Sequence, residues 1–247
     1  MSLISFENVV KDFDGRKVLD GLSFSVEKGE ILAIVGPSGT GKSVTLKHIV
    51  RLLTPDSGRV TVDGVDVSEC SSRQLRAIRR RVGYLFQGGA LLAWKTVEEN
   101  VALPLKECDC LPDDKIDRRV EAALAAVELS DAAEKFPAEI SGGMQKRAGL
   151  ARAIVRESDV VLYDEPTSGL DPVTSASIMR LICDLRDRRG VTSVVVTHDL
   201  AAAMRTSDRI MLLSGGKSVL CASPAEFAAS REPLVAEFIS AMKGESS

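Results

Sequence analysis

Long apolar runs are missing from this sequence. The longest uninterrupted apolar stretch covers only residues 122–127, whereas a helix that crosses a bilayer needs about 20 predominantly apolar residues. The first residues, Met1–Glu7, also lack the basic start and the apolar core of a secretory signal peptide. We therefore expect a cytosolic protein whose role at a membrane, if it has one, depends on a partner.

Cysteine is scarce and scattered. The five cysteines are odd in number and mostly far apart, which is not the pattern of a disulfide framework. Cys108 and Cys110 form one close pair, and the two histidines, His48 and His198, lie far from it in the sequence. Because structural zinc sites generally combine two such pairs of ligands, we do not expect zinc to bind here.

An excess of positive charge is missing as well. The chain has 32 Lys and Arg residues against 35 Asp and Glu residues, a net charge of −3, so no nucleic-acid partner is expected. The most basic stretch, residues 73–81, is interpreted as the solvated face of a helix. The remaining composition, 45% apolar and 27% charged, is that of a globular chain long enough for one large α/β domain.

A glycine-rich stretch provides the first functional signal. It fits the P-loop pattern G-x-x-x-x-G-K-[S/T], and it lies between a strand-like stretch, residues 31–35, and a helix-like stretch, residues 44–53. The loop consists of Gly36, Pro37, Ser38, Gly39, Thr40, Gly41, Lys42 and Ser43. Its glycines let backbone N–H groups point at a phosphate, next to the positive end of the helix dipole. We expect Lys42 to contact the β- and γ-phosphates and Ser43 to bind Mg²⁺. The alternative is a chance glycine-rich turn with a surface lysine.

The rest of the chain predicts an α/β fold with a helical insertion. Strand-like stretches at residues 4–10 and 18–26 closely precede the P-loop strand, which favours a small antiparallel β-subdomain. Residues 88–156 have a helical pattern with little strand signal, and buried-strand patterns resume after them. The predicted organisation is a single domain over residues 1–247, with a core of residues 1–87 and 157–247 and a helical subdomain of residues 88–156.

Polar residues follow three predicted strands. Asp164 and Glu165 end one apolar strand, His198 ends another and Gln87 ends a third. Ligands of α/β sheets bind at the carboxyl ends of strands, and neighbouring strand residues point in opposite directions. We expect Asp164 to hold Mg²⁺ through water and Glu165 to polarise the attacking water. We expect His198 to contact the γ-phosphate, and Gln87 to reach Mg²⁺ and the attacking water. The alternatives are an exposed acidic turn and a structural histidine.

The segment Glu139–Arg147 resembles the signature motif of ABC-transporter ATPases. The order along the chain is also that of the family: P-loop, Gln87, signature, Asp164–Glu165, Ser168–Asp171 and His198. The resemblance extends over residues 3–242 and implies a P-loop NTPase core that binds ATP and Mg²⁺. It also implies a head-to-tail homodimer, in which ATP bound at Lys42 of one copy meets Ser141 and Gly143 of the other copy.

The same resemblance assigns roles to the site residues. Ser141–Gly143 open a helix, whose N–H groups are expected to form a second anion site. Phe13 by itself is more typical of a core residue, but its place ahead of the P-loop in this family favours stacking on adenine. The catalytic residues implied are Lys42, Gln87, Glu165 and His198. The Mg²⁺ ligands implied are Ser43, Gln87 and Asp164. Beyond the P-loop, the nucleotide-binding residues implied are Phe13, Val44, Ser141, Gly142, Gly143, Met144 and Asp171.

Two departures from the usual motifs narrow the class of transporter. Met144 stands where the usual signature has Gln, and Gln87 is followed by Gly-Gly-Ala-Leu at residues 88–91. Both features are similar to the ATPase subunits of Mla/Mce lipid transporters, which implies a phospholipid or another lipid as cargo. That resemblance implies a separate membrane permease docked near residues 87–101, a Mce-domain lipid-binding protein, and a peripheral location on the cytoplasmic side of the inner membrane. The alternatives are the ATPase of a small-solute importer, of the polar amino acid type, and a soluble ABC ATPase without a transport role.

Overall fold

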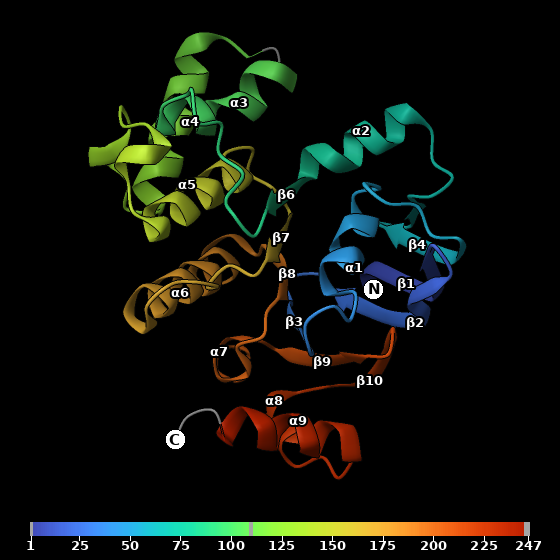
Figure 1. Cartoon of the computed structure of the whole chain (residues 1–247). Coiled ribbons are helices and arrows are strands. Elements are labelled where there is room, and N and C mark those ends of the chain that lie inside the picture. Colours follow the sequence, from blue (N-terminus) through green and yellow to red (C-terminus); the bar gives the residue numbers. More distant parts are fainter. Residues whose placement is uncertain (1, 109–110, 245–247) are drawn as a thin grey trace. The chain divides into compact units, whose positions relative to one another are not determined.

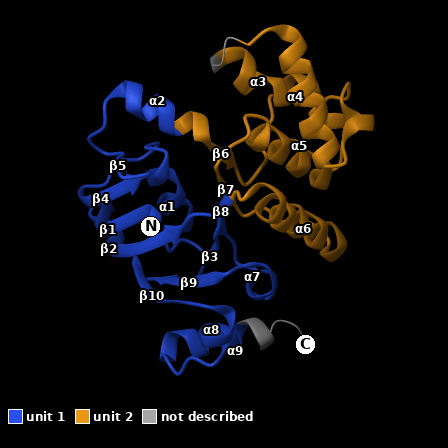
Figure 2. Cartoon of the chain, turned by 180° about the vertical axis from the view of Figure 1, so that it is seen from behind, with its two compact units in different colours: residues 1–78, 192–247 blue, residues 79–191 orange. Residues whose placement is uncertain are grey.

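The chain forms two compact units. The computed structural model describes residues 2–108 and 111–244, so the Cys108–Cys110 pair lies outside the side chains that it describes. Unit 1 consists of residues 1–78 and 192–247, and unit 2 of residues 79–191 (Figure 2). Within the described ranges, no helix combines the length and apolar character needed to cross a membrane. The division predicted from the sequence, into a core of residues 1–87 and 157–247 and a helical subdomain of residues 88–156, stays a prediction.

Unit 1 contains the antiparallel sheet that the sequence predicts. Its strand order is β2-β1-β4-β5, with the bounds β1 (Ser2–Phe13), β2 (Arg16–Glu27), β4 (Ser57–Val62) and β5 (Val65–Asp66) (Figure 1). Phe6 of β1 pairs with Phe24 of β2 and Val60 of β4, and the two phenylalanine rings stack with centroids 4.5 Å apart. Asp14–Gly15 and Asp63–Gly64 have positive φ angles, as tight hairpin turns require.

The second sheet of unit 1 carries the P-loop. It belongs to a six-stranded sheet of order β10-β9-β3-β8-β7-β6, whose strands in unit 1 have the bounds β3 (Ile31–Val35), β8 (Thr192–Val196), β9 (Arg209–Ser214) and β10 (Lys217–Ala222). β3 runs parallel to both β8 and β9. Every residue of β3 and β8 is buried, which is typical of central strands covered on both faces. The helices of this unit are α1 (Lys42–Ile49), α7 (Leu200–Thr206), α8 (Pro224–Ala228) and α9 (Pro233–Gly244). Another helix, α2 (Ser72–Arg81), continues into unit 2.

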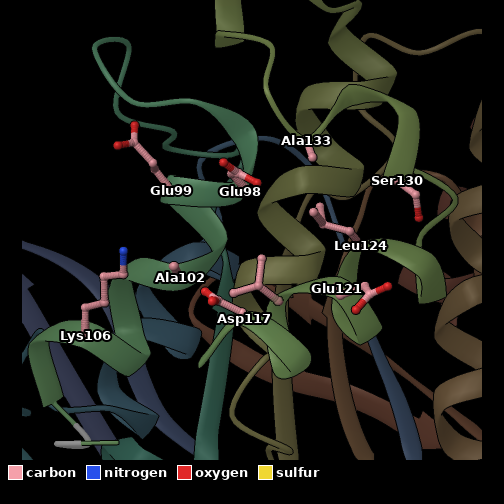
Figure 3. A pocket seen from close by; sticks show the side chains of 10 residues that line it. Glu98, Glu99, Ala102, Lys106, Asp117, Glu121, Leu124, Ser130 and Ala133 are labelled. Carbon is pink, nitrogen blue, oxygen red and sulfur yellow. The ribbon is translucent and has the colours of Figure 1, made fainter. Parts of the chain in front are cut away.

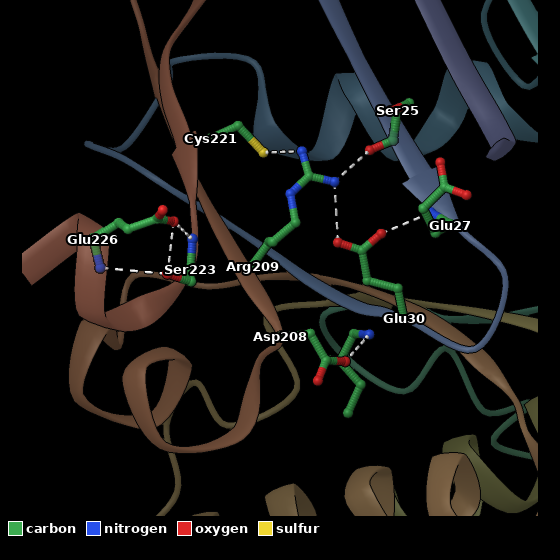
Figure 4. Close-up of polar contacts among 9 residues, drawn as sticks. Ser25, Glu27, Glu30, Asp208, Arg209, Cys221, Ser223 and Glu226 are labelled. Atoms are coloured by element: carbon green, nitrogen blue, oxygen red, sulfur yellow. Dashed lines mark hydrogen bonds and ion pairs between the residues drawn. The ribbon is translucent and has the colours of Figure 1, made fainter. Parts of the chain in front are cut away.

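A partly buried ion pair joins the ends of β2, β3 and β9 in unit 1 (Figure 4). Glu30, only 7% exposed, accepts a hydrogen bond from the Glu27 N–H at 2.6 Å and pairs with the Arg209 guanidinium at 3.1 Å. Arg209 also donates to the Ser25 carbonyl at 3.3 Å and to the Cys221 sulfur at 2.9 Å. Burial raises the pKa of the Cys221 thiol, so the sulfur stays protonated at neutral pH. These contacts fix the segment that enters the P-loop strand.

Unit 2 combines a parallel strand pair with four helices. The strands are β6 (Val82–Leu85) and β7 (Val160–Asp164). The helices are α3 (Val97–Cys108), α4 (Asp113–Ala126), α5 (Gly142–Ile154) and α6 (Pro172–Arg189), with short 3₁₀ turns η1 (Ser130–Ala132) and η2 (Pro137–Glu139). A capping box opens α3: Thr96 N–H donates to Glu99, and Glu99 N–H donates to the Thr96 hydroxyl. The helical pattern of the sequence therefore corresponds to real helices.

Helix α5 packs unusually closely against its neighbours because of three glycines. A Cβ added at Gly83 of β6 would overlap the Ala153 carbonyl of α5, and one added at Gly149 would lie 2.8 Å from the Leu85 side chain. A Cβ added at Gly143 would lie 2.7 Å from the methyl group of Thr174 in the first turn of α6. α5 therefore contacts both β6 and α6 at a distance that only glycine allows.

Gly142→Ala and Gly143→Ala form a matched pair that tests this packing. A methyl group at position 142 meets no atom within 4 Å, so the better helix propensity of Ala should raise the free energy of unfolding by about 0.5–1 kcal/mol. A methyl group at position 143 must displace Thr174 or the helix, and should lower it by about 1–3 kcal/mol. Urea unfolding measures both values, and equal effects would contradict the close approach of α5 to α6.

Candidate functional site

The P-loop joins the end of β3 to the start of α1, and two of its glycines are required by their surroundings. A Cβ added at Gly36 would overlap the backbone carbonyl of Leu213. Gly41 has φ +97°, and a Cβ added there would lie 3.0 Å from the Val18 carbonyl. The loop is therefore held close to β9 and β2, with the N-terminus of α1 at its inner end. The first N–H groups of a helix point out of its N-terminus, where an anion binds favourably.

Lys42 is folded back over this loop. Its side chain is buried, and Nζ donates to the Gly36 carbonyl at 2.8 Å and the Pro37 carbonyl at 3.0 Å. The Thr40 hydroxyl also donates to the Pro37 carbonyl, at 2.9 Å. A buried ammonium group is costly unless it has strong partners, and a phosphate would be a better partner than two carbonyls. The glycine cradle and this lysine thus fit a nucleotide phosphate chain.

The other loop residues are more accessible. Pro37, Ser38 and Gly39 are exposed, and Ser43 and Val44 in the first turn of α1 are partly exposed. A hydroxyl group at this position, one residue after Lys42, suits a Mg²⁺ ion that accompanies phosphate. The P-loop therefore has both the donors and the oxygen ligand that a magnesium nucleotide needs.

Two further predicted residues lie in unit 1. Phe13, at the end of β1, is 41% exposed and is not part of the core. The Lys11 ammonium lies over one face of its ring, 5.4 Å from the ring centre, which is a cation–π contact. His198 is exposed and follows β8. The residues on either side of it, Thr197 and Asp199, are held by hydrogen bonds. The Thr197 hydroxyl accepts a hydrogen bond from the Asp199 N–H at 3.0 Å, and the Asp199 carboxylate caps α7 by accepting one from the Ala202 N–H at 2.8 Å.

The two adjacent acids end β7 in unit 2, and both are nearly buried. Asp164 is 5% exposed, and the Tyr84 hydroxyl lies 3.4 Å from its Oδ2. Burial, with the charge of Asp164, raises the pKa of Tyr84, so the phenol remains a hydrogen-bond donor to the carboxylate. Glu165 is 9% exposed and has a φ of +53°, a left-handed conformation that costs a non-glycine residue about 1–2 kcal/mol. The backbone thus turns sharply at Glu165.

A lysine that the sequence interpretation gave no role stabilises this turn. Lys146 of α5 is only 7% exposed, and its Nζ donates to the Glu165 carbonyl at 3.0 Å. It also donates to the Ser168 carbonyl at 2.5 Å and the Ser168 hydroxyl at 3.0 Å. The helical spacing of the sequence could have indicated this role, because it places Lys146 on the buried face of α5 together with Gly143, Leu150 and Ala153. A charged residue at such a position requires partners.

Helix α5 begins within the signature segment, and helix α6 begins at the end of the loop that follows β7. Ser141 is the N-cap of α5, where its hydroxyl accepts the Met144 N–H at 3.3 Å. Asp171 is the N-cap of α6, with Oδ1 3.0 Å from the Val173 and Thr174 N–H groups. Hydrogen bonds from Thr174 hold the pKa of Asp171 below its usual value. Ser141 and Asp171 therefore stabilise two helix starts in unit 2.

Gln87 lies in an exposed turn after β6, and the residues that follow it are tied to α5. Arg152 donates to the Gly89 carbonyl at 2.6 Å and to the Ala90 carbonyl at 2.7 Å. Farther along, Asn100 is fully buried and donates to the carbonyls of Leu92, Lys95 and Thr96. This segment is therefore a fixed surface rather than a loose loop.

A cavity of about 440 Å³ opens beside α3 and α4 in unit 2 (Figure 3). Its apolar lining comes from Ala102, Val120, Leu124 and Ala133. Its charged lining comes from Glu98, Glu99, Asp117, Glu121 and Lys106. An apolar surface bordered mainly by carboxylates is suited to an amphipathic segment that carries positive charge.

The predicted site residues divide between the two units. Unit 1 holds Phe13, Gly36, Pro37, Ser38, Gly39, Thr40, Gly41, Lys42, Ser43, Val44 and His198. Unit 2 holds Gln87, Ser141, Gly142, Gly143, Met144, Asp164, Glu165 and Asp171. Within each unit the residues lie at the ends of strands or the starts of helices, the positions where α/β folds bind ligands.

Comparison with known proteins places this arrangement in a family. Residues 19–168 match the family described as ABC transporter. The chain is 42% identical over 221 residues to the methionine import ATP-binding protein MetN 2 of Pseudomonas entomophila, covering 88% of this chain and 66% of that one. It is 39% identical over 236 residues to the probable ribonucleotide transport ATP-binding protein mkl of Mycobacterium tuberculosis, covering 96% of this chain and 66% of that one. The chain thus spans about two thirds of the length of these two relatives.

Another relative is matched over most of its own length. The chain is 38% identical over 245 residues to the intermembrane phospholipid transport system ATP-binding protein MlaF of Haemophilus influenzae, covering 99% of this chain and 92% of that one.

Solved structures agree with the family match. The ATP-binding cassette MJ0796, in a dimeric post-hydrolysis state bound to ADP and Pi, superposes with a TM-score of 0.82 at 32% identity, covering 90% of this chain and 98% of that one. The protein cbiO1 of Clostridium perfringens, part of the ABC transporter complex cbiONQ, superposes with a TM-score of 0.85 at 29% identity, covering 94% of this chain and 92% of that one. The expected α/β P-loop fold is therefore confirmed, and the chain belongs to the ABC transporter family, whose ATPase domain it carries.

Proposed function

We propose that this protein is the ATP-binding and ATP-hydrolysing subunit of an ABC transporter that moves lipid, of the Mla/Mce type. The lipid assignment is carried by one pattern, Gly-Gly-Ala-Leu after Gln87 together with Met144 in the signature. The 38% identity to a phospholipid transport ATP-binding protein supports it. The ATPase assignment rests on the P-loop cradle and the buried Lys42.

The chain's own residues have distinct parts in the proposed reaction. Lys42 leaves the Gly36 and Pro37 carbonyls and binds the β- and γ-phosphates, while the N–H groups at the start of α1 hold the phosphate oxygens. Glu165 accepts a hydrogen bond from the attacking water and orients it. His198 binds the γ-phosphate. Ser43, Gln87 and Asp164 are the side chains that would hold Mg²⁺, and the ion would neutralise negative charge on the phosphates.

The second half of each ATP site comes from another copy of the chain. One copy has a single P-loop and a single signature motif, and the family arrangement pairs these motifs between two copies. Ser141, Gly142 and Gly143 then offer the start of α5 to the γ-phosphate of the partner's ATP, next to Met144. The proposal of a homodimer is supported by the dimeric state of MJ0796.

The cavity beside α3 and α4 is proposed as the docking surface for the permease. Glu98 and Glu99 of its wall lie within residues 87–101, the segment that binds a permease helix in the family resemblance, and Asn100 and Arg152 keep that segment fixed. Its carboxylates call for a permease helix with Lys or Arg residues beside its apolar face. With such a partner, the protein is peripheral to the cytoplasmic side of the inner membrane.

A small-solute importer is the second candidate. The methionine import relative has 42% identity, so the ATPase chemistry and the docking surface serve this function equally well. The two candidates differ in the partner proteins, a Mce-domain lipid-binding protein for lipid transport and a small-solute binding protein for import.

Lys42→Ala and Glu165→Gln should both abolish ATP turnover, but for different reasons. The lysine variant loses the ammonium group that binds phosphate, so ATP no longer drives dimerisation. The glutamine variant still binds ATP but cannot polarise water, so it should accumulate as an ATP-bound dimer. Light scattering with and without ATP distinguishes them. A Glu165→Gln variant that stays monomeric with ATP, or wild-type turnover in Lys42→Ala, would contradict the scheme.

Phe13→Ala should weaken ATP binding by about 1–3 kcal/mol if the ring stacks on the base. The fold should be nearly unaffected, because Phe13 is 41% exposed. Isothermal titration with ATP and with inorganic triphosphate separates a base contact from a phosphate contact. An unchanged affinity for ATP would remove Phe13 from the nucleotide site.

Affinity purification of the tagged full chain from its native membranes tests the transport assignment. We expect a multispanning permease together with a Mce-domain protein. The double variant Glu98→Lys/Glu121→Lys reverses charge in the docking cavity, and should lose the permease while keeping ATP binding. Recovery of a small-solute binding protein would favour the importer, and recovery of no membrane protein would exclude both transport candidates.

A further inference from the structure

The buried ammonium group of Lys146 has no place in the roles assigned above. It lies in unit 2, on the same helix as the signature residues, and its contacts are to backbone and hydroxyl oxygens at the turn that carries Glu165. Burial lowers the pKa of Lys146, while the charge of Glu165 acts in the opposite direction. A costly buried charge is retained where it performs a specific task.

The hydrogen-bonding capacity of Lys146 matches the turn. An ammonium group has three N–H donors, and three acceptors lie within 3.0 Å of Nζ: the Glu165 carbonyl, the Ser168 carbonyl and the Ser168 hydroxyl. The Ser168 hydroxyl in turn donates to the Glu165 carbonyl at 3.2 Å, and the Ser168 N–H does so at 3.3 Å. Lys146 therefore closes a network that defines the path of residues 165–168.

This network acts on a residue whose backbone is strained. Glu165 has φ +53°, and such a conformation persists when the surroundings impose it. Removing the ammonium group leaves the Ser168 carbonyl without its short partner and lets the turn relax. A small displacement of the backbone at Glu165 moves its carboxylate, and a misplacement of about 1 Å can cost a reaction roughly 100-fold in rate.

The position of Lys146 along α5 adds a second consequence. Ser141 caps the helix that carries Lys146 five residues later, so the two lie about 7.5 Å apart along one rigid helix. In the proposed head-to-tail dimer, Ser141 belongs to the partner's ATP site, whereas Glu165 belongs to the site of its own copy. Movement of α5 at one site therefore reaches the turn at the other site through Lys146.

We propose that Lys146 is a positioning residue that sets the geometry of Glu165 and couples it to the signature motif of the same copy, so that the two ATP sites of the dimer act cooperatively. This inference rests on the proposed function, because it needs ATP hydrolysis and the dimer. Lys146 acts through its hydrogen bonds to the Glu165–Ser168 turn.

Steady-state ATP hydrolysis by the full-length chain tests the inference with three variants. Lys146→Met keeps the length of the side chain but removes all donors, and should lower kcat about 100-fold with KM nearly unchanged. Its Hill coefficient for ATP should fall from a wild-type value above one to about one. Lys146→Arg keeps the charge and the donors, and should recover most of kcat and cooperativity.

Arg147→Met is the matched control. Arg147 is the next residue of α5, and its guanidinium donates to Glu128, the Val127 carbonyl and the Ser177 hydroxyl instead of the Glu165 turn. It should destabilise the helix without a selective loss of kcat. Similar kcat losses in Lys146→Met and Arg147→Met would reduce Lys146 to a structural role and overturn the inference.

The remaining outcomes are also decisive. A wild-type Hill coefficient of one, or an unchanged coefficient in Lys146→Met, overturns the coupling between sites. Unchanged kcat in a folded Lys146→Met variant overturns the positioning role. A wild-type chain that neither hydrolyses ATP nor dimerises with it contradicts the proposed function first, and the inference fails with it. If Lys146→Met does not fold, Lys146→Gln takes its place: it keeps two N–H donors but not the charge, and should lower kcat with KM nearly unchanged, whereas a kcat no lower than that of Arg147→Met overturns the positioning role.

Discussion

Unit 2 depends on how closely the backbone of α5 approaches the elements around it. Glycines at positions 83, 143 and 149 remove the side chains that would separate this helix from β6 and α6. At that short range, side chains of α5 reach the carbonyl groups of neighbouring loops directly, as Lys146 and Arg152 do. One helix thus fixes the turn at Glu165 and the segment after Gln87, and its own N-terminus presents the signature residues.

The P-loop of unit 1 obeys the same physical rule. Gly36 and Gly41 allow the loop to lie against the Leu213 and Val18 carbonyls. These carbonyls belong to β9 and β2, and the partly buried Glu30–Arg209 pair joins the ends of the same two strands. In both units, close packing around glycines positions the functional backbone groups. A buried lysine, Lys42 or Lys146, donates hydrogen bonds to the carbonyl groups beside them.

Local patterns in the sequence were sufficient to predict the elements. The P-loop and the strands at residues 4–10 and 18–26 depend on residues within a few positions of one another, and the structure confirms the predicted antiparallel sheet. The turns at Asp14–Gly15 and Asp63–Gly64 and the capping box at Thr96 are equally local. The partners of Lys146 were out of reach for a physical reason. Two of them are backbone carbonyls 19 and 22 positions away, and every residue has a carbonyl, so the sequence does not single these out. The third is the Ser168 hydroxyl. The roles of the site residues stay predictions.

The cavity beside α3 and α4 differs from α5 in how freely it can change. Glu98, Glu99, Asp117 and Glu121 are exposed on the surfaces of their helices, and surface substitutions of this kind usually alter stability by less than about 0.5 kcal/mol. In the docking role proposed above, substitutions could therefore change the charge pattern of the cavity, and with it the partner, without disturbing the buried network around Glu165. Such freedom would fit the three relatives, 38–42% identical to this chain, whose names give three different cargoes.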